Sequence, residues 1–152
     1  MDRFDKAILA ILQQDATLPV TVVANRVGLS KSACGQRIQK LEKSGVITAR
    51  LTLLDSSKLN LPLTTFLVVR TNRHDPHGLD KFERVVKEIP EVLEIHRLLG
   101  DMDYLIKAVV TDMDGYSRLY KQLNEEASLY SLNSNFVMET VKNTTTLPLK
   151  YV

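Results

Sequence analysis

Hydrophobic positions in the first 45 residues recur every three or four residues, the period of amphipathic helices. The spacing predicts one helix over about Asp2–Gln14 and a second over about Val20–Val27. A third helix is expected over about Lys31–Ser44, with Ser30 as its N-cap because Ser30 follows Gly28 and Leu29 and opens an unbroken helical stretch. Glycine at positions 28 and 45 suits a sharp turn and a helix end.

The third helix divides into a hydrophobic and a polar face. Cys34, Ile38 and Leu41 lie on the inner face, and the opposite face is polar and basic. Two short helices joined by a tight turn, the second one basic, form a helix-turn-helix, which favours duplex DNA as the partner. An ordinary solvated helix face is the alternative. The side chains with chemistry suited to phosphates and base edges are Ser30, Lys31, Ser32, Gln36, Arg37, Gln39, Lys40 and Lys43.

The rest of the chain switches between strand and helix patterns. Residues Val46–Leu54 are β-rich and suggest a short wing or a connector, followed by turn residues. The pattern then predicts β-α-β-β-α-β, which is the ferredoxin-like arrangement. The expected strands are Leu63–Thr71, Val92–Leu99, Tyr104–Val110 and Leu132–Lys142, the helices are Leu79–Ile89 and Asp112–Glu126, and the main connections are a loop at Asn72–Gly78 and a tight turn at Gly100–Asp103.

The inner faces of the two later helices follow from the same spacing. We expect Leu79, Phe82, Val86 and Ile89 to be buried on the first. On the second we expect Met113, Tyr116, Tyr120 and Leu123 to point inward. A core position is also the simplest interpretation of Leu98.

These elements define an α+β protein with two domains. We place a winged helix-turn-helix domain at residues 1–50, a β connector at 51–62 and a ferredoxin-like domain at 63–152. A three-helix unit is small for a free-standing domain, so we expect it to lean on a partner.

Composition narrows the class of protein. The chain has 152 residues, 44% hydrophobic and 25% charged, with a single cysteine. No hydrophobic run approaches the roughly 20 residues that span a bilayer, and the start lacks a signal-peptide pattern, so we expect a cytoplasmic protein without membrane contact.

Residues 1–50 hold eight Lys and Arg against four Asp and Glu, whereas residues 51–152 hold twelve against fourteen. The basic charge therefore coincides with the helix-turn-helix.

Catalytic and metal-binding patterns are lacking in the sequence. There is no G-x-S-x-G or phosphate-binding loop, and Cys34 has no evident activating partner. His74, His77 and His96 do not have zinc-site spacing. Asp101 and Asp103 could form a carboxylate pair, but a hairpin is expected to expose both to water. We therefore expect neither enzyme activity, nor a cofactor, nor a metal.

Four segments together resemble the Lrp/AsnC family of transcription regulators, also called feast/famine regulators. They are MDRFDKAILAILQQDA at the start, GLSKSACGQRIQKLEKSGVI, GDMDYLI from Gly100, and FVMETVK from Phe136. The resemblance implies a ferredoxin-like domain of the RAM type that binds an amino acid or related metabolite. It also implies homodimers paired through the C-terminal sheets, which assemble into tetramers or octamers with the effector between dimers.

The resemblance further implies an effector site at the GDMDY turn and the last strand. Asp103 is a natural partner for an ammonium group, and backbone N–H groups of the turn can hold a carboxylate. A plain hairpin turn with two solvated aspartates is the alternative. The last strand departs from the family pattern, because EASLYSLNSNF lacks the usual Pro and Gly, and its polar residues favour a polar effector. The implied residues are Leu98, Gly100, Asp101, Met102, Asp103, Tyr104, Ser134, Asn135, Phe136 and Val137.

The sequence thus predicts a homo-oligomeric, sequence-specific regulator that binds double-stranded DNA and responds to a small effector. One alternative is an architectural protein that compacts DNA with little sequence preference. Another is a metabolite-binding or enzymatic module whose helix-turn-helix contacts protein.

Overall fold

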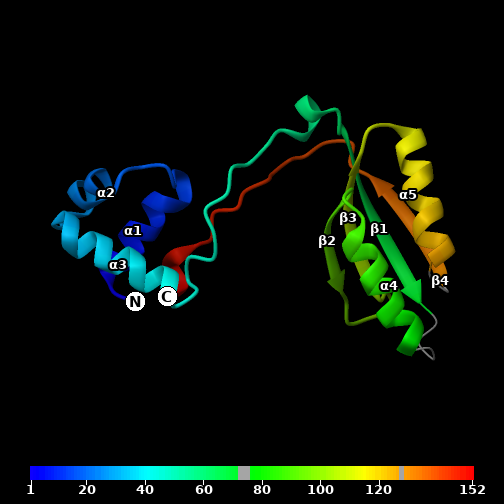
Figure 1. The fold of residues 1–152 in the computed structure, drawn as a ribbon, viewed down its shortest axis with the longest axis horizontal. Helices are drawn as coiled ribbons and strands as arrows, with labels where there is room; N and C mark the ends of the chain where they lie inside the picture. The colour runs from blue at the N-terminus through cyan, green and yellow to red at the C-terminus, as the bar shows by residue number, and fades with distance from the viewer. Residues whose placement is uncertain (72–75, 127–128) are drawn as a thin grey trace. The chain divides into compact units, whose positions relative to one another are not determined.

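The computed structural model describes residues 1–71, 79–125 and 129–152 in full, and residues 76–78 and 126 by their backbone only. The chain forms two compact units, each with its own hydrophobic core. One unit contains Met1–Leu53 together with Lys142–Val152, and the other contains Leu54–Val141 (Figure 1).

Three helices build the first unit, as the spacing predicted: α1 (Arg3–Gln14), α2 (Val20–Val27) and α3 (Lys31–Lys43). Ser30 caps α3, because its Oγ accepts a hydrogen bond of 3.2 Å from the N–H of Ala33. Gly28 and Gly45 have φ of 71° and 73°, a left-handed backbone that suits glycine at helix ends. The buried side chains are Ile8, Leu9, Val23, Ala24, Cys34, Ile38 and Leu41.

The C-terminal tail, residues 142–152, belongs to this first unit rather than to the C-terminal domain in which the sequence analysis placed it. The Gln13 side chain pairs with the backbone of Leu147. Its Nε2 donates to the Leu147 carbonyl over 3.2 Å, and its Oε1 accepts from the Leu147 N–H over 2.7 Å. Leu149 packs against the three-helix core. So small a unit was expected to need further packing contacts. The tail supplies part of them.

The second unit is the expected βαββαβ domain. The sheet order is β2-β3-β1-β4 and every neighbouring pair is antiparallel, which confirms the ferredoxin-like arrangement. Its elements are β1 (Leu63–Thr71), α4 (Pro76–Glu88), β2 (Val92–Arg97), β3 (Tyr104–Val110), α5 (Met113–Glu126) and β4 (Leu129–Phe136).

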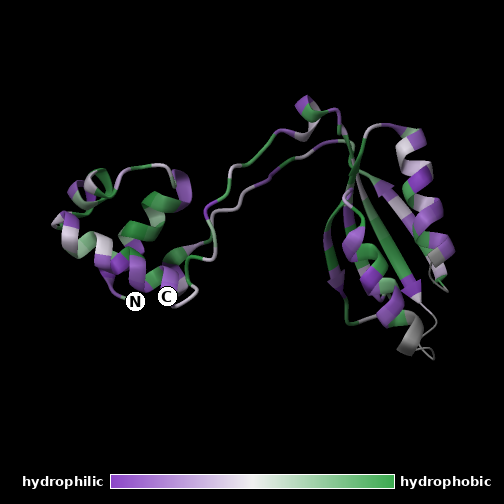
Figure 2. Ribbon diagram, viewed as in Figure 1, coloured by the Kyte–Doolittle hydropathy of each residue, from purple (hydrophilic) through white to green (hydrophobic). Residues whose placement is uncertain are grey.

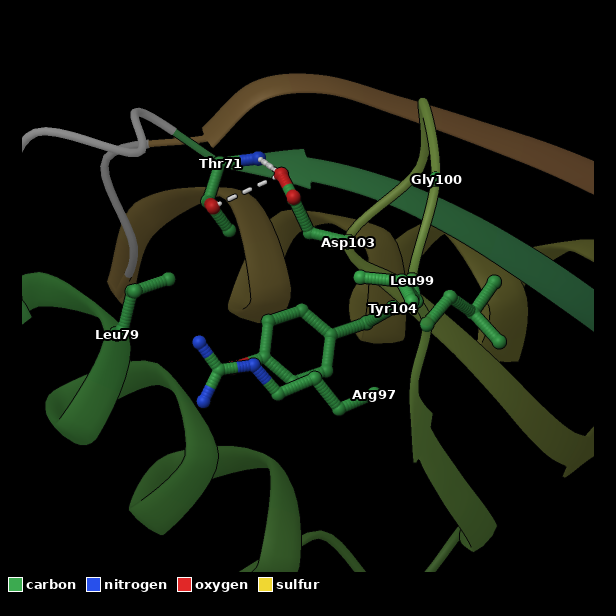
Figure 3. A pocket seen from close by; sticks show the side chains of 8 residues that line it. Thr71, Leu79, Arg97, Leu99, Gly100, Asp103 and Tyr104 are labelled. Atoms are coloured by element: carbon green, nitrogen blue, oxygen red, sulfur yellow. Dashed lines mark hydrogen bonds between the residues drawn. The ribbon is translucent and has the colours of Figure 1, made fainter.

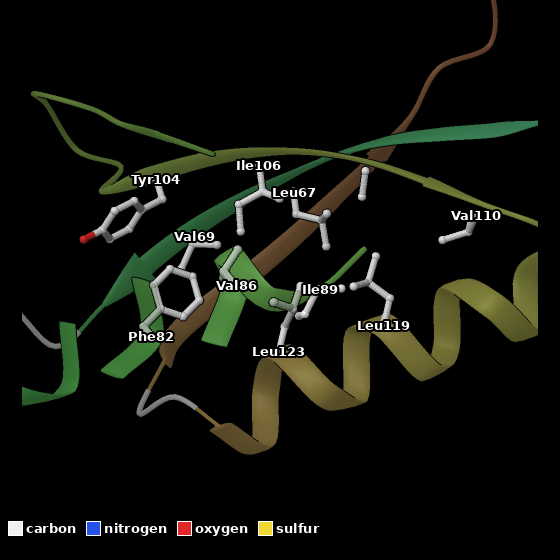
Figure 4. Packing of buried hydrophobic residues seen from close by; sticks show 11 residues of the cluster. Leu67, Val69, Phe82, Val86, Ile89, Tyr104, Ile106, Val110, Leu119 and Leu123 are labelled. Carbon is white, nitrogen blue, oxygen red and sulfur yellow. The ribbon is translucent and has the colours of Figure 1, made fainter. Parts of the chain in front are cut away.

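Both helices of this unit pack on one face of the sheet (Figure 4). Leu67 and Val69 of β1 alternate with residues of the other face, as a period of two requires. The strand β1 is hydrophobic along most of its length (Figure 2). The buried cluster consists of Leu67, Val69, Phe82, Val86, Ile89, Tyr104, Ile106, Ala108, Val110, Leu119 and Leu123.

Three expected elements differ in the structure. Residues 46–54 contain no strand, so the wing is absent; no other described strand pairs with them, and an unpaired strand gains no ladder hydrogen bonds. The strand β4 ends at Phe136 rather than Lys142. Residues 72–75 of the loop expected at Asn72–Gly78 lie outside the described residues, and α4 already begins at Pro76.

The inner face of α5 also differs from the prediction. Leu119 and Leu123 are buried, whereas Met113 and Tyr120 are exposed and Tyr116 is half-buried. The expected face was therefore rotated relative to the observed one. Leu98, for which a core position was expected, is exposed at the end of the β2–β3 hairpin.

Candidate functional site

The polar face of α3 is exposed, as the helical spacing predicted. Cys34, Ile38 and Leu41 are buried, which directs the other side of the helix to solvent. Lys31, Ser32, Gln36, Gln39, Lys40 and Lys43 are all exposed. This surface offers ammonium groups for phosphates and amides for base edges.

Arg37, also expected to contact DNA, is bound to other side chains of the protein. Its Nη1 lies 2.7 Å from Asp2 Oδ2 and 2.7 Å from Asp5 Oδ1, and its guanidinium lies 5.4 Å from the centroid of the Phe4 ring. The side chain thus connects α3 to the N-terminus of α1. A backbone hydrogen bond from Asp5 and the bond from Arg37 lower the pKa of Asp2. Partial burial alone would raise the pKa of Asp5, but Arg37 and the N–H of Asp2 outweigh it and lower that pKa too.

A hollow of about 290 Å³ opens where the β2–β3 hairpin meets the end of β1 and the first turn of α4 (Figure 3). This volume is at the lower end of the range for small-molecule sites, roughly 300–1,000 Å³. The lining residues are Thr71, Leu79, Arg97, Leu98, Leu99, Gly100, Asp103 and Tyr104.

Asp103 ties the hairpin to β1. Its Oδ2 accepts hydrogen bonds from the N–H of Thr71 over 2.8 Å and from the Thr71 hydroxyl over 3.0 Å (Figure 3). Its own N–H donates to the carbonyl of Val69 over 2.9 Å. Asp103 is half-buried, and its carboxylate is hydrogen-bonded to Thr71. From the sequence, a carboxylate exposed to water was expected. Gly100 has φ of 152°, which favours glycine in this turn.

Tyr104 forms an uncharged wall of the hollow. Its ring is buried and lies 5.2 Å from that of Phe82, and its hydroxyl donates to Glu83 Oε1 over 2.8 Å. Burial, reinforced by this hydrogen bond, raises the pKa of Tyr104 to about 12. The phenol therefore keeps its proton at neutral pH.

The lining of the hollow contains two opposite charges and several hydrophobic side chains. Arg97 and Asp103 both line it, together with Leu79, Leu98 and Leu99. Asp101 and Met102, also expected at the site, are exposed and do not line it.

Within a single chain, the four residues at the end of β4 that were expected in the effector site lie away from the hollow. Ser134 pairs in register with Leu67, while Tyr104 pairs with Val69, and β4 is separated from β3 by the whole of β1. The Ser134 hydroxyl accepts a hydrogen bond of 2.8 Å from the Tyr116 hydroxyl. One chain thus does not bring Ser134, Asn135, Phe136 and Val137 into the hollow, and their part in a site stays a prediction.

Four lining residues were not predicted from the sequence: Thr71, Leu79, Arg97 and Leu99. Arg97 and Leu99 had a local signal, because a hairpin around Gly100 places its flanking residues opposite the GDMDY segment. Thr71 and Leu79 had none, since they reach the hollow from other elements.

The sheet face without helices carries a mixed surface. Phe66, Val68 and Leu105 are half-buried there, and Lys107 Nζ lies 2.9 Å from Glu94 Oε1. None of the described helices is long and hydrophobic enough to cross a membrane.

Two family models match the chain. The AsnC-type helix-turn-helix domain matches residues 1–42, and the Lrp/AsnC ligand binding domain matches residues 64–147. The second match includes every residue that lines the hollow.

Individual relatives resemble the chain over its full length. It is 40% identical over 152 residues to the HTH-type transcriptional regulator Zrp of Zymomonas mobilis, which covers 100% of this chain and 99% of the relative. It is 46% identical to an AsnC family transcriptional regulator from Agrobacterium tumefaciens, with a TM-score of 0.93 and coverage of 99% of each chain. A transcriptional regulator from Neisseria meningitidis, solved as a complex with L-methionine, is 33% identical, with a TM-score of 0.95 and coverage of 99% and 98%.

Proposed function

Because the chain belongs to the Lrp/AsnC family of transcriptional regulators and carries both its DNA-binding and its ligand-binding domain, we propose that an amino acid bound in the hollow controls its binding to DNA. The protein acts in the cytoplasm, on double-stranded DNA, without a metal or an enzymatic step. The effector changes the assembly state or the DNA affinity only as far as it binds one state more tightly than the other.

The single observation that carries the effector class is that two opposite charges, those of Arg97 and Asp103, line one small hollow. Arg97 and Asp103 complement the two charges of an amino acid, and the three leucines suit a hydrophobic side chain. The relative from Neisseria meningitidis, whose complex holds L-methionine, supports an amino acid as the effector.

The DNA-binding half of the proposal rests on α3. Its exposed face enters the major groove, where Gln36 and Gln39 reach base edges and the lysines reach phosphates. Ser30 and Arg37 hold the helix in place from its N-terminus and its flank.

Self-association completes the proposed mechanism. The helix-free face of the sheet, with Phe66, Val68 and Leu105, pairs two subunits, and further contacts build tetramers or octamers. Two α3 helices then reach half-sites about one helical turn apart, or a multiple of it. In such an assembly, Ser134–Val137 of one subunit can approach the hollow of another.

Asp103→Asn tests the effector site. The amide oxygen can still accept from Thr71, but the charge that faces an ammonium group is lost. We expect amino-acid affinity, measured by isothermal titration calorimetry, to fall about tenfold or more, while DNA binding without effector stays at the wild-type level. The matched control is Asp101→Asn, an exposed aspartate of the same turn that should leave affinity unchanged. An unaltered affinity in Asp103→Asn would remove Asp103 from the site.

A further inference from the structure

We propose that Arg97 binds the carboxylate of the effector, so that the site selects ligands with a free α-carboxylate. This inference rests on the proposed function, because it assigns one end of the amino acid that the hollow is proposed to hold. It adds a residue outside the GDMDY turn and outside β4.

The position of Arg97 follows from strand register. Arg97 is the last residue of β2 and pairs with Tyr104, the first residue of β3. Paired residues of an antiparallel ladder direct their side chains to the same face. The Tyr104 ring packs on Phe82 of α4, so Arg97 also lies on the helix-covered face, where the hollow opens. Figure 3 shows the guanidinium directed toward Leu79 across the hollow.

The guanidinium of Arg97 makes no hydrogen bond or ion pair with any residue that the structure describes. Arg37 and Arg50, by contrast, pair with carboxylates at 2.7 and 2.9 Å. A guanidinium offers a planar array of N–H donors that matches a carboxylate through two parallel hydrogen bonds. Arg97 therefore presents a carboxylate-binding group to the hollow.

The carboxylate of Glu83, although nearby, is not bound to the Arg97 guanidinium. It accepts from the Tyr104 hydroxyl over 2.8 Å and lies 3.4 Å from Lys87 Nζ. The hydrogen bond from Tyr104 contributes most to lowering the pKa of Glu83, and the Arg97 charge contributes least among the causes. Arg97 thus influences Glu83 through space without being paired to it.

The two charges then fix the orientation of the effector. A carboxylate on Arg97 and an ammonium group on the Asp103 side leave the effector side chain among Leu79, Leu98 and Leu99. The competing arrangement holds the carboxylate on backbone N–H groups of the turn at Gly100. The two arrangements differ in one respect, namely whether loss of Arg97 removes the preference for acid over amide.

A thermodynamic cycle on the full-length protein tests the assignment. Each of the common L-amino acids is titrated calorimetrically into the wild type, and the tightest is compared with its α-carboxamide. Both probes are then titrated into Arg97→Met and Arg97→Lys, with Arg84→Met, an exposed arginine of α4 that does not line the hollow, as control.

We expect the wild type and Arg84→Met to bind the acid about tenfold or more tightly than the amide. Arg97→Met should bind both probes equally, and Arg97→Lys should lie between. Equal binding of acid and amide by the wild type would overturn the role of Arg97 without any variant, as would an unchanged acid preference in Arg97→Met. In either case the effector function stands. If no amino acid binds the wild type at all, the proposed function itself fails.

Discussion

Arg37 joins two carboxylates at the start of α1 to the middle of the recognition helix α3. Its bonds of 2.7 Å to Asp2 and Asp5 connect residues that lie more than 30 positions apart in the chain. The same carboxylates cap α1, since Asp2 accepts from the N–H groups of Phe4 and Asp5. Arg37 therefore fixes the position of α3 relative to the start of α1.

Replacing Arg37 by alanine should lower the free energy of unfolding of the first unit at pH 7, because two ion pairs between α1 and α3 are lost. The pKa values of Asp2 and Asp5 are lowered in the folded state, so this stabilisation is full above the ordinary aspartate value of 3.8 and disappears as the pH falls through the lowered values. The difference between wild type and variant in thermal unfolding should therefore shrink below about pH 4.

Lys40→Ala is the matched control for that experiment, because Lys40 is an exposed cation on the same helix. It should leave the thermal midpoint unchanged and weaken DNA binding through a lost phosphate contact. A gap between wild type and Arg37→Ala that is equally large at pH 7 and pH 3 would contradict the ion-pair explanation.

Individual residues could be predicted where a local sequence pattern indicates their structural role. Ser30, Gly28 and Gly45 follow from capping and turn chemistry, and the exposed face of α3 follows from the spacing of Cys34 and Ile38. Thr71 could not be predicted, because a bond to Asp103 across 32 positions leaves no trace in the sequence around either residue.

The C-terminal tail is the element whose place was not expected. Its only specific anchors to the three helices, among the described residues, are the paired hydrogen bonds between Gln13 and Leu147 and the packing of Leu149. A polar run of Thr144–Thr146 precedes them, and nothing in its composition distinguishes a docked tail from a loose one.

Leu149→Ala should destabilise the three-helix unit by about 1–2 kcal/mol, less than the roughly 2–5 kcal/mol typical of a fully buried leucine, because Leu149 is only half-buried. Hydrogen exchange of α1 amides in the full-length protein measures the effect. Leu147→Ala is the control, since the Leu147 side chain is exposed and Gln13 binds only its backbone. Equal exchange rates in the two variants would show that the tail does not stabilise α1.

The end of β4 explains one error at the scale of elements. No Gly or Pro interrupts the segment FVMETVK after Phe136, and the strand was expected to continue to Lys142. In the structure Phe136 pairs with Thr65, and the N–H of Val137 makes a further bond to Thr64. The partner strand β1 begins at Leu63, so later residues have no ladder to join. Strand length depended on the partner, which periodicity does not encode.

Charge is divided unequally between the two units. Residues 1–53 and 142–152 hold ten Lys and Arg against four Asp and Glu, a net charge of +6. Residues 54–141 hold ten against fourteen, a net charge of −4. The tail adds two lysines and no acid, so its docking sharpens the basic character of the DNA-binding unit beyond what the sequence division suggested.

DNA affinity should consequently depend steeply on salt. Each neutralised phosphate contributes about −0.9 to the slope of log K against log salt concentration. Replacing Lys40 by alanine removes one contact per subunit and should make the slope of a dimer shallower by about 2, as measured by fluorescence anisotropy. Lys121→Ala, which removes an exposed lysine of α5, should leave the slope unchanged. A slope insensitive to Lys40 would place phosphate contacts elsewhere.

The central claim is that an amino acid in the second unit controls sequence-specific DNA binding by the first. It is tested most directly by selecting sheared genomic DNA with the purified protein, with and without a mixture of the common L-amino acids, and sequencing what binds. We expect enrichment of a few regions that share a pseudo-palindrome, and a change in that enrichment with amino acids that is lost in Asp103→Asn. Broad, AT-biased enrichment that ignores amino acids would contradict it.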